Sequence, residues 1–161
     1  MLRLEATQQL AQLAIAKGIS ISTAESCTGG GLAKAFTDLA GSSAWFGYGL
    51  VTYSNEAKQQ LLQVSNQSLQ EEGAVSQAVV KQMVKGACQL SGSQLAVAIS
   101  GVAGPGGGSP QKPVGTVWLA WGNQQQQLSH CYQFTGTRQQ IREASIDAAI
   151  THLIEWLSSE L

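Results

Sequence analysis

Residues 19–31 read Ile-Ser-Ile-Ser-Thr-Ala-Glu-Ser-Cys-Thr-Gly-Gly-Gly and carry the clearest signal for the fold. The segment Ile19–Ala24 is short and β-branched, which predicts a strand. Thr28–Gly31 then opens a helix that we expect to continue to about Leu39. Glycines reduce the stability of a helix, so three in a row predict the close approach of a ligand or of another part of the backbone.

Strands and helices alternate along the rest of the chain. Helices are predicted over residues 3–17, 56–62, 77–90 and 138–158, with Asn55, Ser76 and Thr137 as caps of the last three, and strands over residues 44–53, 95–101, 114–121 and 128–134. The continuous apolar run at Leu95–Gly101 indicates a buried central strand. The last two strands form a predicted hairpin, so we expect an α/β sandwich in which helices flank a mixed sheet.

Composition places the chain in the class of single-domain globular proteins. Its 161 residues suit one domain over residues 1–161, and 43% of them are hydrophobic. Only 12% are charged and the net charge is −1, which argues against a nucleic-acid partner. No apolar run is long enough for a membrane span, and no signal peptide is evident. The three cysteines, Cys27, Cys88 and Cys131, form no pair at metal or disulfide spacing, which favours the reducing cytoplasm.

A serine and a lysine supply the candidate chemistry. Ser26 lies where the predicted strand gives way to the predicted helix, whose N-terminus favours developing negative charge. Lys58 could take a proton from this serine only if its pKa were lowered by desolvation or a nearby cation. We predict Ser26 as a nucleophile, Lys58 as its base and the Tyr53 hydroxyl as a proton relay or orienting group. The alternatives are a serine that only caps a helix, a solvated lysine and a tyrosine that packs at a strand end.

Cys27 is the alternative nucleophile, because a thiol near a helix N-terminus can have a depressed pKa. Cysteine hydrolases generally need a histidine partner, and the chain has only His130 and His152. Neither has an evident acidic partner, which also argues against a Ser-His-Asp triad. We therefore expect Cys27 to be a small buried neighbour of Ser26.

Two glycine-rich segments can present free backbone N–H groups to an oxyanion or a phosphate. The candidate binding residues in them are Thr28, Gly29, Gly30, Gly101 and Gly104. The second segment is not a P-loop, because no Gly-Lys-Ser/Thr follows it, and the alternative is a plain flexible loop. Arg138 and Arg142 are four residues apart and could bind phosphate, or pair at the surface with Glu143 or a neighbouring carboxylate. The scattered histidines and carboxylates do not form a metal-ligand set.

Together these motifs resemble the CinA C-terminal domain family. The matching segments are residues 23–30 (TAESCTGG), 41–46 (GSSAWF), 51–58 (VTYSNEAK), 73–76 (GAVS), 100–105 (SGVAGP), 112–117 (KPVGTV), 137–138 (TR) and 141–142 (IR). They occur in the same order and extend the resemblance over about residues 5–157. The departures are small: Gly31 replaces a bulkier residue, and Gly106–Gly108 is richer in glycine than the usual loop.

The resemblance implies a three-layer α/β/α sandwich that hydrolyses the carboxamide of nicotinamide mononucleotide to nicotinate mononucleotide and ammonia. It implies that Ser26 is the nucleophile, Lys58 and Tyr53 are its catalytic partners, and Arg142 is associated with the substrate. It implies no cofactor and favours a homodimer. Some family members carry an additional N-terminal domain with pyrophosphatase activity, which we expect to be absent from this chain.

Two other functions stay open at this point. The first is a non-catalytic nucleotide-binding or regulatory module, although such a module should have lost at least one of Ser26, Tyr53 and Lys58. The second is hydrolysis of another amide or ester by the same serine and lysine.

Overall fold

A five-stranded mixed sheet forms the middle layer of the molecule, and the computed structural model describes residues 1–159. The strands are β1 (Ile21–Glu25), β2 (Phe46–Val51), β3 (Leu95–Gly101), β4 (Thr116–Gly122) and β5 (Gln127–Gln133), in the order β2-β1-β3-β4-β5. β1 pairs in parallel with β2 and β3, whereas β4 is antiparallel to both β3 and β5. The predicted mixed sheet and its hairpin are confirmed.

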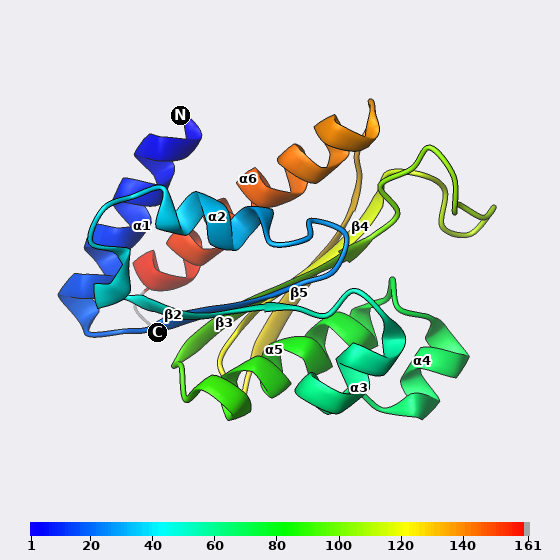
Figure 1. Ribbon diagram of the computed structural model, residues 1–161, viewed down its shortest axis with the longest axis horizontal. Coiled ribbons are helices and arrows are strands. Elements are labelled where there is room, and N and C mark those ends of the chain that lie inside the picture. The colour runs from blue at the N-terminus through cyan, green and yellow to red at the C-terminus, as the bar shows by residue number, and fades with distance from the viewer. Residues whose placement is uncertain (160–161) are drawn as a thin grey trace.

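Helices cover both faces of this sheet. On one face lie α1 (Arg3–Lys17), α2 (Gly31–Thr37) and α6 (Arg138–Ser158), and on the other α3 (Asn55–Leu62), α4 (Asn66–Glu72) and α5 (Gln77–Ser91) (Figure 1). A short 3-10 helix, Ser42–Ala44, precedes β2. The predicted three-layer α/β/α sandwich is confirmed. None of the helices within residues 1–159 is long and apolar enough to cross a membrane.

Side-chain caps fix where four of the helices begin, and at α4 the Ser65 hydroxyl accepts a hydrogen bond from the Ser68 N–H. Ser76 accepts a hydrogen bond from the Val79 N–H, and Thr137 forms a capping box with Gln140, so both predicted caps are confirmed. The cap predicted at Asn55 is wrong by one position. Ser54 accepts from the N–H of Ala57, and Asn55 is the first helical residue.

The order of the strands creates a crevice at the carboxyl end of β1. The chain leaves β1 through α2 on one face of the sheet to reach β2, then returns through α5 on the other face to reach β3. Where two successive connections run over opposite faces of an open α/β sheet, the crevice between them is the usual ligand site. β3 is fully buried from Leu95 to Ile99, which confirms the predicted central strand.

The contact between α3 and α5 sets the position of Lys58. Gly86 of α5 lies against the carbonyl of Leu62, one turn after Lys58 in α3, and a Cβ at this glycine would overlap that carbonyl. Alanine favours a helix over glycine by about 1 kcal/mol, but overpacking typically costs about 1–3 kcal/mol. We expect Gly86→Ala to lower the free energy of unfolding in urea by roughly 1–2 kcal/mol.

Gly47→Ala is the matched control for this substitution. Gly47 lies in β2, and a Cβ there would have no atom of the described residues within 4 Å, so the free energy of unfolding of this variant should change by less than about 0.5 kcal/mol. Equal stability of the two variants would contradict a close α3–α5 contact.

Candidate active site

Ser26 lies directly after β1 and is held by the sheet. Its N–H donates to the Ile99 carbonyl of β3 at 2.9 Å, so the residue continues the parallel pairing beyond the end of the strand. Successive side chains of a strand point to opposite faces, which sends Glu25 toward α2 and Ser26 toward α3. The Ser26 hydroxyl oxygen lies 3.0 Å from the Nζ of Lys58, and Ser26 is 8% exposed.

Lys58 is buried, with 1% of its surface exposed. Its Nζ donates to the carbonyls of Thr52 at 2.9 Å and Tyr53 at 3.2 Å, and lies 3.0 Å from the Ser26 hydroxyl. An ammonium has three donors, and these contacts use all of them. A neutral amine has two hydrogens and one lone pair. Because carbonyls only accept, the neutral amine keeps both hydrogens on Thr52 and Tyr53 and turns its lone pair to Ser26.

Burial lowers the pKa of the Lys58 amino group below the ordinary value for lysine. Desolvation has this direction because it disfavours the charged form of the group. The alternative of a solvated surface lysine is therefore wrong. The geometry instead places an amine suited to accept a proton beside a serine hydroxyl.

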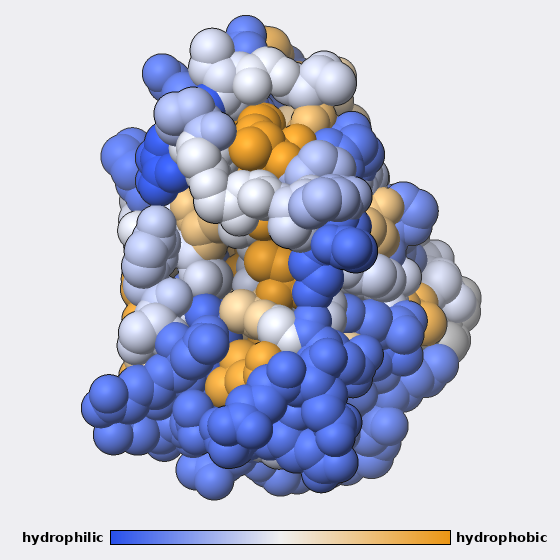
Figure 2. Space-filling model, turned by 90° about the vertical axis from the view of Figure 1, so that its right-hand side faces the viewer, coloured by the Kyte–Doolittle hydropathy of each residue, from blue (hydrophilic) through white to orange (hydrophobic). Residues whose placement is uncertain are grey.

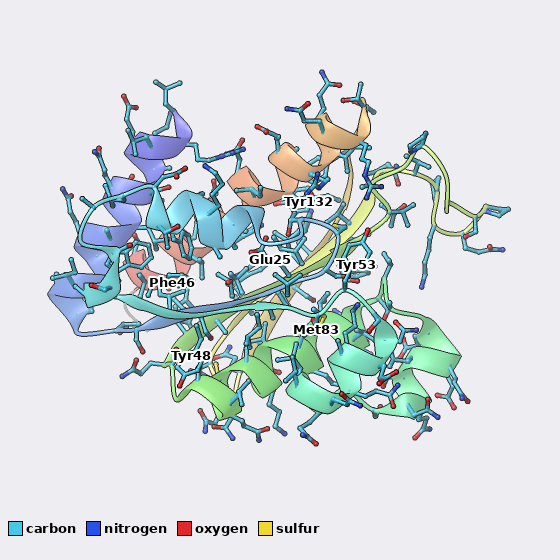
Figure 3. All side chains as sticks on the ribbon, in the orientation of Figure 1. Glu25, Phe46, Tyr48, Tyr53, Met83 and Tyr132 are labelled. Atoms are coloured by element: carbon cyan, nitrogen blue, oxygen red, sulfur yellow. The ribbon has the colours of Figure 1, made fainter. Side chains whose placement is uncertain are left out.

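Tyr53 contributes its carbonyl to the contacts of Lys58. Its hydroxyl, predicted as a proton relay or orienting group, makes no hydrogen bond with Ser26 or Lys58 within residues 1–159. Figure 3 shows Tyr53 beyond the end of β2, and the residue is 61% exposed. Its hydroxyl accepts a hydrogen bond from Nη2 of Arg138 at 3.3 Å, and Nη1 of Arg138 donates to the Gly104 carbonyl at 2.7 Å. The sequence did not indicate either the carbonyl contact with Lys58 or the link between Tyr53 and Arg138.

The turn after Ser26 is held from two sides. The Thr28 hydroxyl donates to the buried carboxylate of Glu25 at 2.6 Å. From α6, Arg142 donates through Nε to the Cys27 carbonyl at 3.0 Å and through Nη2 to the Thr28 carbonyl at 3.3 Å. Sequence reasoning assigned no role to Glu25. A carboxylate at the end of a buried strand was the signal available, because a buried charge needs partners.

Each of the three glycines in this turn is required either by its backbone conformation or by close packing. Gly29 has a φ of +58° and Gly30 a φ of +99°, values that side chains disfavour. A Cβ on Gly31 would lie 2.7 Å from Cδ1 of Ile146 in α6, so this glycine allows the close approach of α2 and α6. Within residues 1–159, the N–H groups of Cys27, Thr28 and Gly30 donate to no other residue.

Two clefts flank the turn. One, of about 300 Å³, is lined by Cys27, Tyr53, Arg138 and the segment Gly101–Gly104. The other, of about 520 Å³, is lined by Thr28, Arg138 and Arg142 among others. Figure 2 views the molecule from the end where the loop after β3 projects, and shows apolar side chains recessed between polar ones. Glu143 pairs with Arg3, so the predicted alternative of a pairing between Glu143 and the two arginines of α6 is wrong.

Cys27 has the properties of a buried neighbour, as predicted. Desolvation raises the pKa of its thiol to about 11, which leaves the sulfur protonated near neutral pH. The histidines lie on other elements, His130 in β5 and His152 in α6. His152 accepts from or donates to the Tyr132 hydroxyl at 2.6 Å and stacks on Trp121. Among the described residues, no cluster of histidines, cysteines and carboxylates could hold a metal ion.

Comparison with known proteins identifies the family of the chain. The family model described as "CinA C-terminal domain" matches residues 4–157 of this chain. The chain is 54% identical over 135 residues to the nicotinamide-nucleotide amidohydrolase PncC of Pseudomonas putida, covering 84% of each protein. It is 46% identical over 151 residues to the protein of the same name from Escherichia coli K12, covering 93% of this chain and 92% of the relative.

A solved structure extends the likeness to the whole fold. The competence-damaged protein (CinA) superfamily protein of Klebsiella pneumoniae 700603 is 40% identical and superimposes with a TM-score of 0.95 over 99% of both chains. The chain belongs to the CinA C-terminal domain family.

Proposed function

We propose that the protein is an enzyme that hydrolyses the carboxamide of nicotinamide mononucleotide, giving nicotinate mononucleotide and ammonia. The names of the amidohydrolase relatives support the substrate. The observation that carries the chemistry is the contact of 3.0 Å between the Ser26 hydroxyl and Lys58, whose other two hydrogen bonds go to carbonyls.

In the proposed reaction, Ser26 attacks the amide carbonyl while Lys58 takes the hydroxyl proton. The tetrahedral intermediate carries an oxyanion, which backbone N–H groups near Thr28–Gly30 or Gly101–Gly104 stabilise. Lys58 then donates its proton to the leaving nitrogen, and ammonia departs. Water hydrolyses the resulting acyl-enzyme with Lys58 again as the base, which releases the carboxylate product and restores Ser26.

In this proposal Tyr53 and Arg142 contact the substrate. Tyr53 borders the cleft that Cys27 also lines, and Arg138 donates a hydrogen bond to its hydroxyl. Arg142 directs Nε and Nη2 at the turn, which leaves Nη1 facing no acceptor within the described residues. We assign that donor to the 5′-phosphate, since guanidinium binds phosphate well.

We propose that the enzyme acts in the cytoplasm on a small molecule and not on a nucleic acid. The three cysteines are free, which suits the cytoplasm. The net charge of −1 gives no attraction for a nucleic acid, so a small molecule is the proposed partner. We further propose that the protein works as a homodimer, as expected from its family.

The proposal is tested by measuring ammonia release from nicotinamide, its riboside and its mononucleotide. Recognition of the phosphate by Arg142 should make the mononucleotide the best of the three, by a factor of about 10–100 in kcat/KM. Equal rates on all three would overturn the substrate assignment. Tight binding of the mononucleotide with no ammonia release would identify a binding module instead.

The rate should also depend on the protonation of Lys58. Because the neutral amine is the base, lowering the pH charges Lys58, removes its lone pair and slows the reaction about tenfold per pH unit. The midpoint should lie below the ordinary pKa of lysine, since burial lowers it. We would measure kcat/KM from about pH 6 to 10, with circular dichroism to verify folding at each pH. A rate that does not change with pH would contradict a lysine base.

A further inference from the structure

Glu25 is a buried carboxylate that the proposed reaction does not use. It is fully buried, and no ion pair joins it to a cation within residues 1–159. Its oxygens accept three hydrogen bonds, from the Thr28 hydroxyl at 2.6 Å, the Leu32 N–H at 2.9 Å and the Ala33 N–H at 3.0 Å. Charge-assisted bonds of this kind are about twice as strong as neutral ones.

These bonds replace the missing cap of α2. The first residues of a helix have N–H groups without partners, and a side chain at the N-cap usually satisfies one of them. The N-cap of α2 is Gly30, which has no side chain to do so. Glu25 reaches these groups from the end of β1, so its bonds close the whole turn over residues 26–30 (Figure 3).

The main chain of Glu25 is connected to both Ser26 and Lys58, the proposed nucleophile and its base. Its peptide bond leads directly into Ser26. Its carbonyl accepts from the Thr52 N–H at 2.9 Å, and the Thr52 carbonyl accepts from Nζ of Lys58 at the same distance. A shift of Glu25 would therefore move the nucleophile and one anchor of its base.

We propose that Glu25 is a positioning residue, whose carboxylate, together with the Thr28 hydroxyl, holds Ser26 in line with Lys58. This inference rests on the proposed function for the reaction that it assists. Thr28 thereby acts through Glu25 as well as through any contact of its backbone with the substrate. The carboxylate and the Ser26 hydroxyl point to opposite faces of the sheet, so Glu25 takes no part in proton transfer.

The inference is tested with Glu25→Gln and with the pair Thr28→Val and Thr28→Ser. Glutamine keeps the size of glutamate but turns an NH₂ group toward N–H donors, and valine keeps the shape of threonine but lacks its hydroxyl. We expect kcat on nicotinamide mononucleotide to fall about 100-fold in Glu25→Gln and about 10-fold in Thr28→Val, with KM changed by less than about threefold. Thr28→Ser, which keeps the hydroxyl, should stay within about twofold of wild type.

The pH profile is the second measurement. Its midpoint reports Lys58 and should not move in these variants, whereas a direct role of Glu25 in proton transfer would shift it. Wild-type kcat in both Glu25→Gln and Thr28→Val, or a loss confined to KM, would overturn the inference. If Glu25→Gln melts at the assay temperature, the comparison of Thr28→Val with Thr28→Ser decides the question alone.

Labelling of Ser26 distinguishes failure of the proposed function from failure of the positioning role. The rate at which a fluorophosphonate labels Ser26, with fluoride as the leaving group, depends on the nucleophile and not on the natural substrate. A wild-type protein that labels but releases no ammonia would overturn the substrate. Slower labelling of Thr28→Val than of Thr28→Ser would still support the positioning role, and equal labelling would contradict it.

Discussion

Ser26→Ala is expected to lower kcat for ammonia release by at least about 10⁴-fold, with little change in KM. The hydroxyl of Ser26 is the group that Lys58 contacts at 3.0 Å, and the alanine variant has no oxygen to form the acyl-enzyme. Water would then have to attack the amide directly, and only binding and oxyanion stabilisation would assist it. The measurement is ammonia release under saturating nicotinamide mononucleotide.

Ser22→Ala is the matched control for this variant. Ser22 lies four residues earlier on the same face of β1, and its buried hydroxyl has no hydrogen-bond partner in the part of the chain that the structure describes. The control should retain wild-type kcat, because its hydroxyl contacts neither the base nor the turn. More than about a tenth of the wild-type rate in Ser26→Ala would exclude Ser26 as the nucleophile.

Lys58→Met is expected to lower kcat by about 10³–10⁴-fold, near the upper limit for loss of a general base. Methionine has a similar length and an apolar end, so it fills the buried space but accepts no proton. Lys58→Arg should be equally impaired, because arginine stays charged in proteins and cannot act as a base. The arginine variant thus separates the need for a neutral amine from the need for a positive charge.

Lys85→Met controls for the general effect of removing a lysine. Lys85 is exposed on α5 and should be replaceable without loss of kcat. Full activity in Lys58→Arg would contradict the assignment of Lys58 as the base and would favour an electrostatic role.

Patterns that depend on neighbours in the chain predicted most of the fold. The apolar run Leu95–Gly101 matches β3 to the residue, and the capping residues Ser76 and Thr137 start the helices that they were expected to start. The helix α4 was missed because Leu69 is its only buried residue, which leaves no apolar periodicity to detect. At α3, Ser54 and Asn55 are both good caps, and local preference alone does not choose between them.

The site was predictable as a set of residues but not as a set of contacts. Ser26 stands at a strand-to-helix junction, which the local sequence reveals. The burial of Lys58 depends on the packing of α3 against α5 at Gly86, a contact between segments far apart in the chain. Glu25 could not be assigned for the same reason, because two of its three partners are backbone N–H groups, which every sequence possesses.

The shielded sulfur of Cys27 determines which inhibitors suit this centre. Soft electrophiles such as acrylamides and chloroacetamides react with thiolates, and the neighbouring thiol is buried with its pKa raised to about 11. Such reagents would meet the exposed Cys131 on β5 first, far along the chain from Ser26. The oxygen of Ser26, with an amine beside it, is a hard nucleophile. Boronic acids and sulfonyl fluorides are therefore better starting points for covalent inhibitors than Michael acceptors.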